Sequence, residues 1–395
     1  MEKDAIVIAA AARTPMGGFQ GDFSSIGAVE LGSAAVGSVV ERAGLDGEDV
    51  SEVLMGCVLP AGLGQAPARQ AALGAGLSKS VPCATVNKMC GSGMKTVMMA
   101  YDSLHARPAD IIIAGGMESM TNAPYLLPKA RQGMRLGHGE VKDHMFLDGL
   151  EDAYDRGKLM GVFAEATARH FQFTRQAQDD FAITSLQRAK KAVDDGTFAG
   201  EVTPVSFKTR KGCTTISHDE QPGKANIDKI PTLRPAFAKD GTVTAANSSS
   251  ISDGAAAVVL MRQSVAEARG ITPLARIVGC ASHAQAPEWF TTAPVGAMTK
   301  LFEQTGWNKD SVDLFEINEA FAVVTMAAMR ELDISHDKVN VHGGACALGH
   351  PIGASGTRII VTLLAALKKY NQAHGVASLC IGGSEATAVA IELIN

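Results

Sequence analysis

Two stretches of this chain align with one another: GSGMKTVMMAYDSL at residues 91–104 and ASGTRIIVTLLAAL at residues 354–367. Each is followed by an apolar run and a Gly-Gly pair, within IAGGME at residues 113–118 and CIGGSE at residues 380–385. An internal repeat of this kind indicates one structural unit used twice. Each copy is therefore predicted to run as strand, tight turn, helix, strand and Gly-Gly turn.

The aligned stretches have the apolar spacing of helices. Apolar side chains recur at i, i+3 and i+4 from Met94 to Leu104, and again from Ile359 to Leu367. The runs that follow, residues 110–115 and 375–380, are apolar in the way that is typical of strands covered on both faces. Two such units predict an α/β fold in which helices pack between and around two sheet layers.

The composition is that of a large globular chain. Apolar residues make up 46% of 395 positions, charged residues 19%, and the net charge is −5, so nucleic acid is not an expected partner. No apolar run approaches the ~20 residues that cross a bilayer, and residues 5–11 are predicted to form a strand rather than a targeting segment. The cysteines are scattered without a C-x-x-C pair, which argues against disulfides or a metal site and favours a reducing, cytoplasmic location.

Charged, proline and polar residues are concentrated between residues 121 and 245. The clearest helix in this stretch is predicted from Thr174 to Asp194, with Thr174 as its N-cap. We interpret the stretch as an insertion that covers a site and interrupts the first half of the chain. The predicted parts are a first half (residues 1–120 and 246–270), a loop domain (residues 121–245) and a second half (residues 271–395).

Cys90 lies directly before the first repeat helix, in NKMCGSGMK at residues 87–95. The N–H groups and positive dipole end of a helix N-terminus stabilise a thiolate and can receive an oxyanion. A buried apolar cysteine is the alternative for an isolated thiol, and the neighbouring glycines favour the nucleophile. A phosphate-binding P-loop is excluded, because the lysine and the upstream glycine are wrongly spaced.

The second copy carries an inserted loop before its helix, and this loop holds His350 between Gly349 and Pro351. A proline restricts the preceding residue to extended geometry. It thereby fixes the direction of the imidazole, as a base beside a thiol requires. Cys380 ends the strand after the second helix, at a sheet edge where α/β sites form. A lone histidine or a lone strand cysteine is otherwise an ordinary surface or core residue.

Asn318 and Glu319 follow the apolar run VDLFEI at residues 312–317. Asn318 is a natural N-cap for a following helix, and Glu319 is a natural first-turn acid. The other interpretation is an amide that holds a water or a substrate carbonyl, and the spacing alone leaves both open.

Together these motifs resemble the signature blocks of the thiolase family. The blocks are Cys90 with its GSG, the NEAF run at residues 318–321, LGHPIGASG at residues 348–356, and CIGG at residues 380–383. Further similarity, at residues 13–21, 64–70 and 242–253, extends the resemblance over essentially the whole chain. The acetyl-CoA acetyltransferase branch of the family fits best.

The resemblance implies two related βαβαβαββ halves in a layered α-β-α-β-α arrangement, plus a loop domain that holds coenzyme A. It implies acetyl-CoA C-acetyltransferase activity, the reversible Claisen condensation of two acetyl-CoA to acetoacetyl-CoA and CoA through an acyl-Cys90 intermediate. Coenzyme A thioesters are then substrates, and no permanently bound cofactor or metal is expected. The likeness of residues 131–139 to the family's tetramer-forming segment implies a homotetramer, a dimer of dimers.

The roles implied by the resemblance follow motif by motif. Cys90 takes the acyl group, His350 activates it and later binds the thioester oxygen, and Cys380 removes or returns the α-proton. Asn318 holds a water that completes one oxyanion hole with His350. The backbone N–H groups of Cys90 and Gly382 form the other.

The residues expected along the coenzyme A thioester are Ser249, Leu159, Met160, Ala320 and Phe321. Leu159 stands where many biosynthetic members have a histidine, and Phe163 replaces a small residue nearby. Both changes make the wall around the acyl group more apolar, so a strict preference for acetyl does not follow from the motifs.

Three other functions share parts of this pattern. A broad-chain degradative 3-ketoacyl-CoA thiolase would use the same residues, and it stays open. A ketoacyl synthase is disfavoured because such enzymes pair one cysteine with two histidines, or with a histidine and an asparagine, and lack a counterpart of Cys380. A non-catalytic carrier of lipid or coenzyme A is disfavoured because Cys90, His350 and Cys380 are all present.

Overall fold

The computed structural model describes residues 4–107, 110–210 and 212–394. A ten-stranded sheet forms its frame, in the order β12-β13-β14-β11-β1-β10-β5-β3-β4, with β2 paired to β10. These strands are β1 (Ile6–Arg13), β2 (Gly17–Gly18), β3 (Glu52–Gly56), β4 (Cys83–Val86), β5 (Ile111–Ser119), β10 (Ser252–Arg262), β11 (Ala275–Ala284), β12 (Leu314–Ile317), β13 (His374–Ile381) and β14 (Glu385–Leu393).

The helices of the two halves cover this sheet and separate its ends. They are α1 (Ala28–Arg42), α2 (Pro67–Gly74), α3 (Ser92–Ala106), α7 (Gln263–Arg269), α8 (Ala293–Thr305), α9 (Ala322–Glu331), α10 (Ala345–Leu348) and α11 (Ser355–Tyr370). The two halves of the sheet meet where β1 pairs with β11 at only two positions. This short seam allows the halves to lie as two separate layers.

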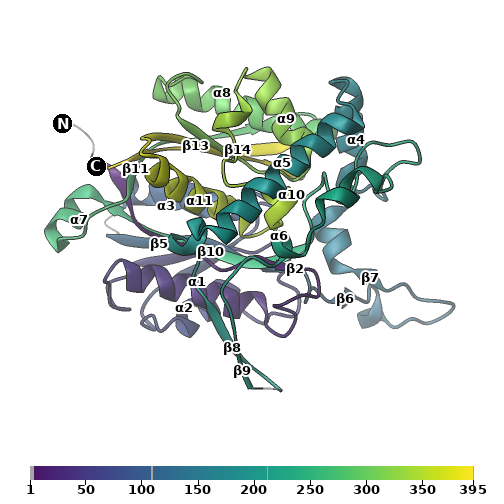
Figure 1. Ribbon diagram of the computed structural model, residues 1–395. Coiled ribbons are helices and arrows are strands. Elements are labelled where there is room, and N and C mark those ends of the chain that lie inside the picture. The colour runs from purple at the N-terminus through teal and green to yellow at the C-terminus, as the bar shows by residue number, and fades with distance from the viewer. Residues whose placement is uncertain (1–3, 108–109, 211, 395) are drawn as a thin grey trace.

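Five layers result, and Figure 1 shows them from bottom to top. Helices α1 and α2 pack on the outer face of the first half, and α8 and α9 pack on the outer face of the second. Helices α3 and α11 lie between the two sheet halves and share one core, to which Val97, Ile112, Ile360 and Leu379 belong. The predicted α-β-α-β-α arrangement is confirmed. Each buried leucine or isoleucine contributes about 1.5–3 kcal/mol to it.

The repeat predicted from the sequence is present, with two differences. Gly115 and Gly116 do not form a turn but lie inside β5, which continues to Ser119. A Cβ on Gly116 would lie 2.0 Å from the carbonyl oxygen of Gly353, so only glycine lets these two backbones touch. In the second half, the segment that corresponds to β4 is not a full strand. It forms a single β-bridge, between Val339 and Phe315.

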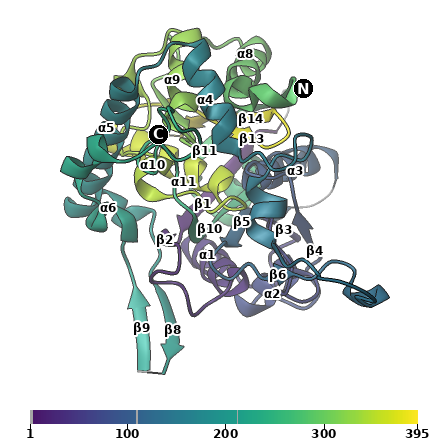
Figure 2. The ribbon, with the colours of Figure 1, turned by 90° about the vertical axis from the view of Figure 1, so that its right-hand side faces the viewer.

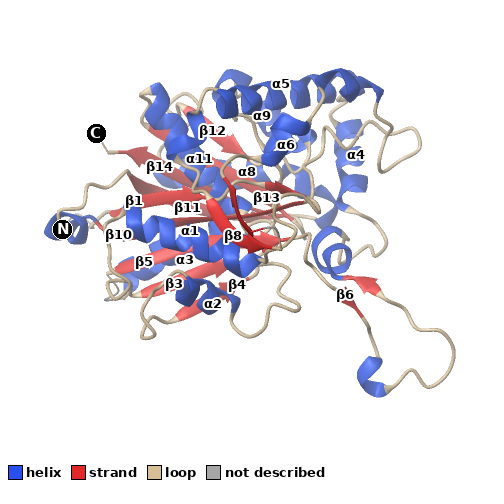
Figure 3. Ribbon diagram, turned by 60° about the horizontal axis from the view of Figure 1, so that its bottom comes forward, coloured by secondary structure: helices blue, strands red, loops and turns tan. Residues whose placement is uncertain are grey.

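The insertion contains more structure than the sequence indicated. The predicted helix is α5 (Arg175–Asp194), and Thr174 caps it by accepting the N–H of Ala177. The other elements are α4 (Met160–His170), α6 (Glu220–Lys224), β6 (Tyr125–Leu126), β7 (Lys142–Asp143), β8 (Val205–Thr209) and β9 (Gly212–Ile216). Figure 2 shows the β8–β9 hairpin projecting from the body, and Figure 3 shows that the arm between β6 and β7 is mostly loop. Over the described ranges, no helix combines the length and apolarity needed to cross a bilayer.

Candidate active site

The turn before α3 holds Cys90 in a fixed position. Lys88 O accepts the N–H of Gly91 at 3.0 Å, and Ser92 Oγ accepts the N–H of Lys88 at 2.8 Å. Met89 adopts a φ of 48°, in the left-handed region that few residues with a side chain occupy. This strained, doubly tied turn presents the Cys90 side chain at the beginning of the helix.

The two repeats meet at this turn. A Cβ on Gly91 would lie 2.3 Å from Ile381 Cδ1, so the residue after Cys90 packs directly on the residue after Cys380. The Cys90 thiol also accepts a hydrogen bond from the backbone N–H of Gly382. Two cysteines far apart in the sequence therefore lie in one place.

Both thiols are protonated at neutral pH. Burial raises the pKa of Cys90 to about 11, although N–H groups of Gly382 and Cys90 itself oppose this. Cys380 is 1% exposed, and burial together with the neighbouring Cys90 raises its pKa well above the ordinary value. The expectation that the helix N-terminus favours a Cys90 thiolate is thus outweighed by desolvation. A Cys90 nucleophile at this position needs a base.

His350 is held with one ring nitrogen free. Its backbone N–H contacts Ser250 O and Ser252 Oγ, each at 3.2 Å. Ser355 Oγ lies 2.5 Å from Nδ1 and 3.0 Å from Pro351 O. Because the Ser355 hydroxyl donates to Pro351, Nδ1 must donate to Ser355, and Nε2 keeps its lone pair. Nε2 is buried without a partner among the described residues.

The electrostatic surroundings keep His350 neutral. Burial, assisted by the positive charge of Arg358, lowers the pKa of His350 to about 3. The following residue but one, Ile352, belongs to the small core cluster against which Cys90 packs, together with Leu59 and Met145. The loop that carries His350 therefore lies near the first thiol, and its imidazole is neutral with the free lone pair that a base for a thiol requires.

Asn318 is not a helix cap. Helix α9 begins at Ala322 with Phe321 in the N-cap position, so both structural explanations of the Asn318-Glu319 pair are wrong. Asn318 donates its backbone N–H to Ser378 O at 3.0 Å, beside the end of β13. Its side chain is 1% exposed, and neither Oδ1 nor Nδ2 has a partner among the described residues. A buried unpaired amide costs about 1–3 kcal/mol, so these atoms favour the interpretation that Asn318 holds a water or a carbonyl.

The residues expected to line the thioester meet beside Cys380. Met160, Ala320 and Phe321 share one cluster with Cys380, and Phe163, Phe237 and Phe290 complete its wall. Leu159 directly precedes Met160 as the N-cap residue of α4. The N–H and the hydroxyl of Ser249 both donate to Ala320 O, at 2.9 and 3.0 Å.

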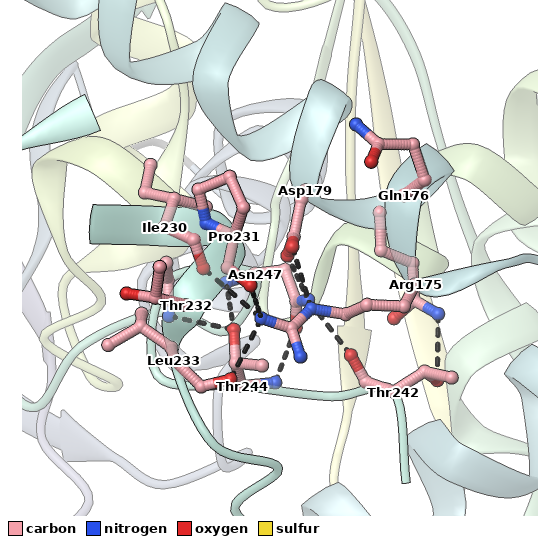
Figure 4. A network of polar contacts seen from close by, with 12 residues as sticks. Arg175, Gln176, Asp179, Ile230, Pro231, Thr232, Leu233, Thr242, Thr244 and Asn247 are labelled. Atoms are coloured by element: carbon pink, nitrogen blue, oxygen red, sulfur yellow. Dashed lines mark hydrogen bonds and ion pairs between the residues drawn. The ribbon is translucent and has the colours of Figure 1, made fainter. Parts of the chain in front are cut away.

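A polar network from α5 braces the segment that leads to Ser249 (Figure 4). Arg175 donates to Asp179 Oδ2 at 2.6 Å and to the carbonyl oxygens of Ile230 and Leu233 at 3.1 and 2.9 Å. Asp179 Oδ1 accepts from Asn247 Nδ2 at 3.0 Å. Residues of the predicted insertion therefore help to position the segment that leads to Ser249.

Sequence reasoning missed the part that three polar residues of this region play, although it named Glu319 as a first-turn acid. Ser355, which fixes the His350 ring, stands in the same motif and could have been found there. Glu118 and Glu319 are 0% and 1% exposed, and they accept the backbone N–H groups of Gly353 and Cys346, on either side of His350. The signal for Glu118 was an acid within an otherwise apolar strand.

Comparison with known proteins agrees with this geometry. The family model for the thiolase N-terminal domain matches residues 6–264, and the model for the thiolase C-terminal domain matches residues 271–393. The chain is 50% identical to acetyl-CoA acetyltransferase 2 of Arabidopsis thaliana, over 98% of this chain and 97% of that protein. It is 48% identical to acetyl-CoA acetyltransferase of Escherichia coli K12, over 98% and 99%.

Solved structures give the same result. The crystal structure of the Bacillus anthracis acetyl-CoA acetyltransferase superposes with a TM-score of 0.97 at 38% identity, covering 99% of both chains. The Acat5 thiolase of Ascaris suum, solved in complex with coenzyme A, superposes with a TM-score of 0.93 at 39% identity, covering 99% of this chain and 100% of that one. With both halves matched from end to end around two converging thiols, this chain belongs to the thiolase family.

Proposed function

We propose that this chain is an acetyl-CoA C-acetyltransferase that interconverts two acetyl-CoA with acetoacetyl-CoA and CoA. The observation that carries the proposal is the convergence of Cys90 and Cys380, one from each repeat, on the same Gly382 turn. Relatives that bear this name match the chain along its whole length, and a thiolase neighbour was solved with coenzyme A. Coenzyme A thioesters are thus the proposed substrates.

In the cleavage direction, His350 Nε2 takes the Cys90 proton as sulfur attacks the 3-keto carbon of acetoacetyl-CoA. The developing oxyanion is received by the backbone N–H groups of Cys90 and Gly382. The C–C bond then breaks, and the departing enolate takes a proton from Cys380. A thiol whose pKa is raised by burial is protonated at neutral pH and suits this acid role.

The acetyl group on Cys90 is then transferred to the sulfur of a free CoA, whose thiol proton passes to the Cys380 thiolate. His350 returns its proton to the departing Cys90 sulfur, so the second acetyl-CoA forms and both cysteines are thiols again. In synthesis the steps reverse: a Cys380 thiolate removes the α-proton of acetyl-CoA, and the carbanion attacks acetyl-Cys90. The enolate oxygen needs donors at that stage. We assign this task to a protonated His350 Nε2 and to a water held by Asn318, because both side chains have buried polar atoms without a partner among the described residues.

Acyl length is the first property to measure. The rate of CoA-dependent cleavage should be compared for 3-ketoacyl-CoA substrates whose acyl chains have about four to about sixteen carbons. An acetyl-CoA acetyltransferase should prefer acetoacetyl-CoA by about tenfold or more over the six-carbon substrate. A flat profile would identify the broad-chain degradative thiolase instead, which the apolar Phe163 in the cluster of Cys380 and the apolar Leu159 at the start of α4 favour. Absence of cleavage at every length would reject the proposal.

We also propose the three-part division inferred from the sequence, with the loop domain as residues 121–245, and a cytoplasmic homotetramer serving lipid metabolism. Support for the oligomer comes from the arm between β6 and β7, where Leu127, Leu136 and Val141 are exposed. Apolar side chains gathered on one projecting arm are typical of a contact surface. Light scattering after size-exclusion chromatography tests this: Leu136→Asp should lower the mass from tetramer to dimer, and an unchanged mass would contradict the assignment.

A further inference from the structure

Two buried carboxylates hold the loop that carries His350, defined here as the histidine loop, residues 343–356. Glu118 comes from the first half of the molecule and Glu319 from the second. We propose that Glu118 and Glu319 are positioning residues that together fix the imidazole of His350 for its reaction with Cys90. This inference rests on the proposed function and adds to it two residues that contact no substrate.

Glu118 accepts a hydrogen bond from the C-terminal side of the histidine loop. Its Oε2 accepts the N–H groups of Gly353 at 2.9 Å and Val58 at 3.0 Å. Its Oε1 accepts the N–H of Leu59 at 3.1 Å and faces Cys57 Sγ at 3.6 Å. Both oxygens therefore face donors only. Glu118 can reach the loop because β5 continues through Gly115 and Gly116 to Ser119.

Glu319 accepts a hydrogen bond from the N-terminal side of the same loop. Its Oε2 accepts the N–H of Cys346 at 3.0 Å and the hydroxyl of Ser185 at 2.7 Å. Its Oε1 accepts from Asn340 Nδ2 at 2.8 Å. Ser185, on α5, also accepts the N–H of Gly344 at 2.9 Å. Helix α5 of the insertion thus contacts both Glu319 and the histidine loop through Ser185.

The two contacts flank His350 in the chain, at Cys346 and at Gly353. Between them the backbone is irregular, and Gly349 adopts a φ of 100°, so neither a long helix nor a strand holds the loop. Glycine-rich backbone loses much entropy when it is ordered. Fixed acceptors on both sides supply the order that the loop itself lacks.

Burying the two carboxylates is unfavourable in free energy. Burial raises the pKa of Glu118 to about 7 and also raises that of Glu319, because the charged forms are desolvated. Apolar packing could hold a loop whose only task was to fold, since buried charges are weak stabilisers. Geometry at His350 is what the carboxylates provide, and an error of about 1 Å in such geometry costs about 100-fold in rate.

The test uses Glu118→Gln and Glu319→Gln, with Glu165→Gln as matched control. Glutamine keeps the shape but turns an NH₂ group toward donors, and at position 319 Asn340 cannot flip to compensate because Ile317 holds both ends of its amide. Glu165 is also buried, and it accepts the N–H groups of Thr242 and Val243, away from the histidine loop. The two loop variants should lower kcat about 10- to 100-fold with little change in KM. The control should keep kcat within about twofold.

A double-mutant cycle separates positioning from general damage. In a His350→Ala background, Glu118→Gln and Glu319→Gln should no longer slow acylation of Cys90, because the group they position is gone. An undiminished effect there, or wild-type kcat in either single variant, would overturn the inference. Ser185→Ala removes one donor to Glu319 and offers a milder variant, expected to lower kcat about 3- to 10-fold, if a glutamine variant fails to fold. Wild-type protein that never acylates Cys90 would instead reject the proposed function itself.

Discussion

The two copies of the repeat begin alike and end differently. In both, a strand follows the repeat helix and reaches a Gly-Gly pair. In the first copy the strand runs on through Gly115 and Gly116 and places Glu118 against the histidine loop. In the second copy β13 stops at Ile381, and Gly382 turns its N–H toward Cys90. The same sequence pattern thus supplies a carboxylate that supports the histidine loop in one half and a turn that contacts Cys90 in the other.

The starts of the two helices differ as well. A tight turn delivers Cys90 to α3, whereas the longer histidine loop delivers His350 near the start of α11. The two helices lie side by side between the sheet halves, which brings both starts to one region. Duplication therefore provides two similar scaffolds, and small differences where strands and helices begin or end place the proposed nucleophile, base and acid on different copies.

The largest expected effect comes from Cys90, the reactive thiol of the first copy. Cys90→Ser should lower kcat for acetoacetyl-CoA cleavage by about 10⁴- to 10⁶-fold, because a hydroxyl is a far weaker nucleophile beside the same base. Mass spectrometry after acetyl-CoA treatment should find no acetyl group on the variant. Turnover equal to wild type would end the proposed mechanism.

Cys380, the thiol of the second copy, should fail at a different step. Cys380→Ser should still accept an acetyl group on position 90 but should lose condensation and cleavage by about 10²- to 10⁴-fold, as expected when a general acid–base group is removed. Acetyl labelling and turnover are measured on the same preparation. Loss of labelling would contradict the division of tasks between the two copies.

Substitutions in the two Gly-Gly pairs should differ in how much they destabilise the fold. Gly116→Ala places a methyl group 2.0 Å from a backbone oxygen and should destabilise the fold by about 3 kcal/mol or more. At the other pair, Gly382→Ala meets nothing closer than 3.7 Å and should change the unfolding free energy by less than about 0.5 kcal/mol. Denaturant titration of both variants measures the contrast. Equal destabilisation would mean that the two pairs serve the same structural purpose.

The smallest effect is a pH dependence that compares the two thiols. The pKa of Cys90 is about 11, so below pH 11 its thiolate fraction rises about tenfold for each unit of increasing pH. Alkylation of Cys90 by iodoacetamide should therefore accelerate about tenfold per unit between pH 7 and pH 10. Cys380, being 1% exposed, should react more slowly throughout. Quenched time points with peptide mapping follow both residues. A plateau for Cys90 near pH 8 would show that its thiolate is stabilised after all.

Much of the site could be predicted from the sequence because its residues lie within glycine-rich motifs. Cys90, His350 and Cys380 were singled out from their local settings, and the structure brings the two cysteines into contact with one turn. Helix α4 was missed because small residues such as Gly161 and Ala164 form much of its buried face. Asn318 stayed ambiguous, since N-caps and water-holding amides follow strands equally well.

The sequence alone determined the duplicated α/β architecture, since apolar periodicity and the repeat are local properties of the chain. Only the tertiary structure decided which glycines are turns and which are close approaches, that Ser355 sets the tautomer of His350, and that two distant carboxylates hold its loop. The physical reason is that burial and hydrogen-bond partners depend on segments far apart in the chain. The protonation of each thiol and the direction of each lone pair follow from those partners.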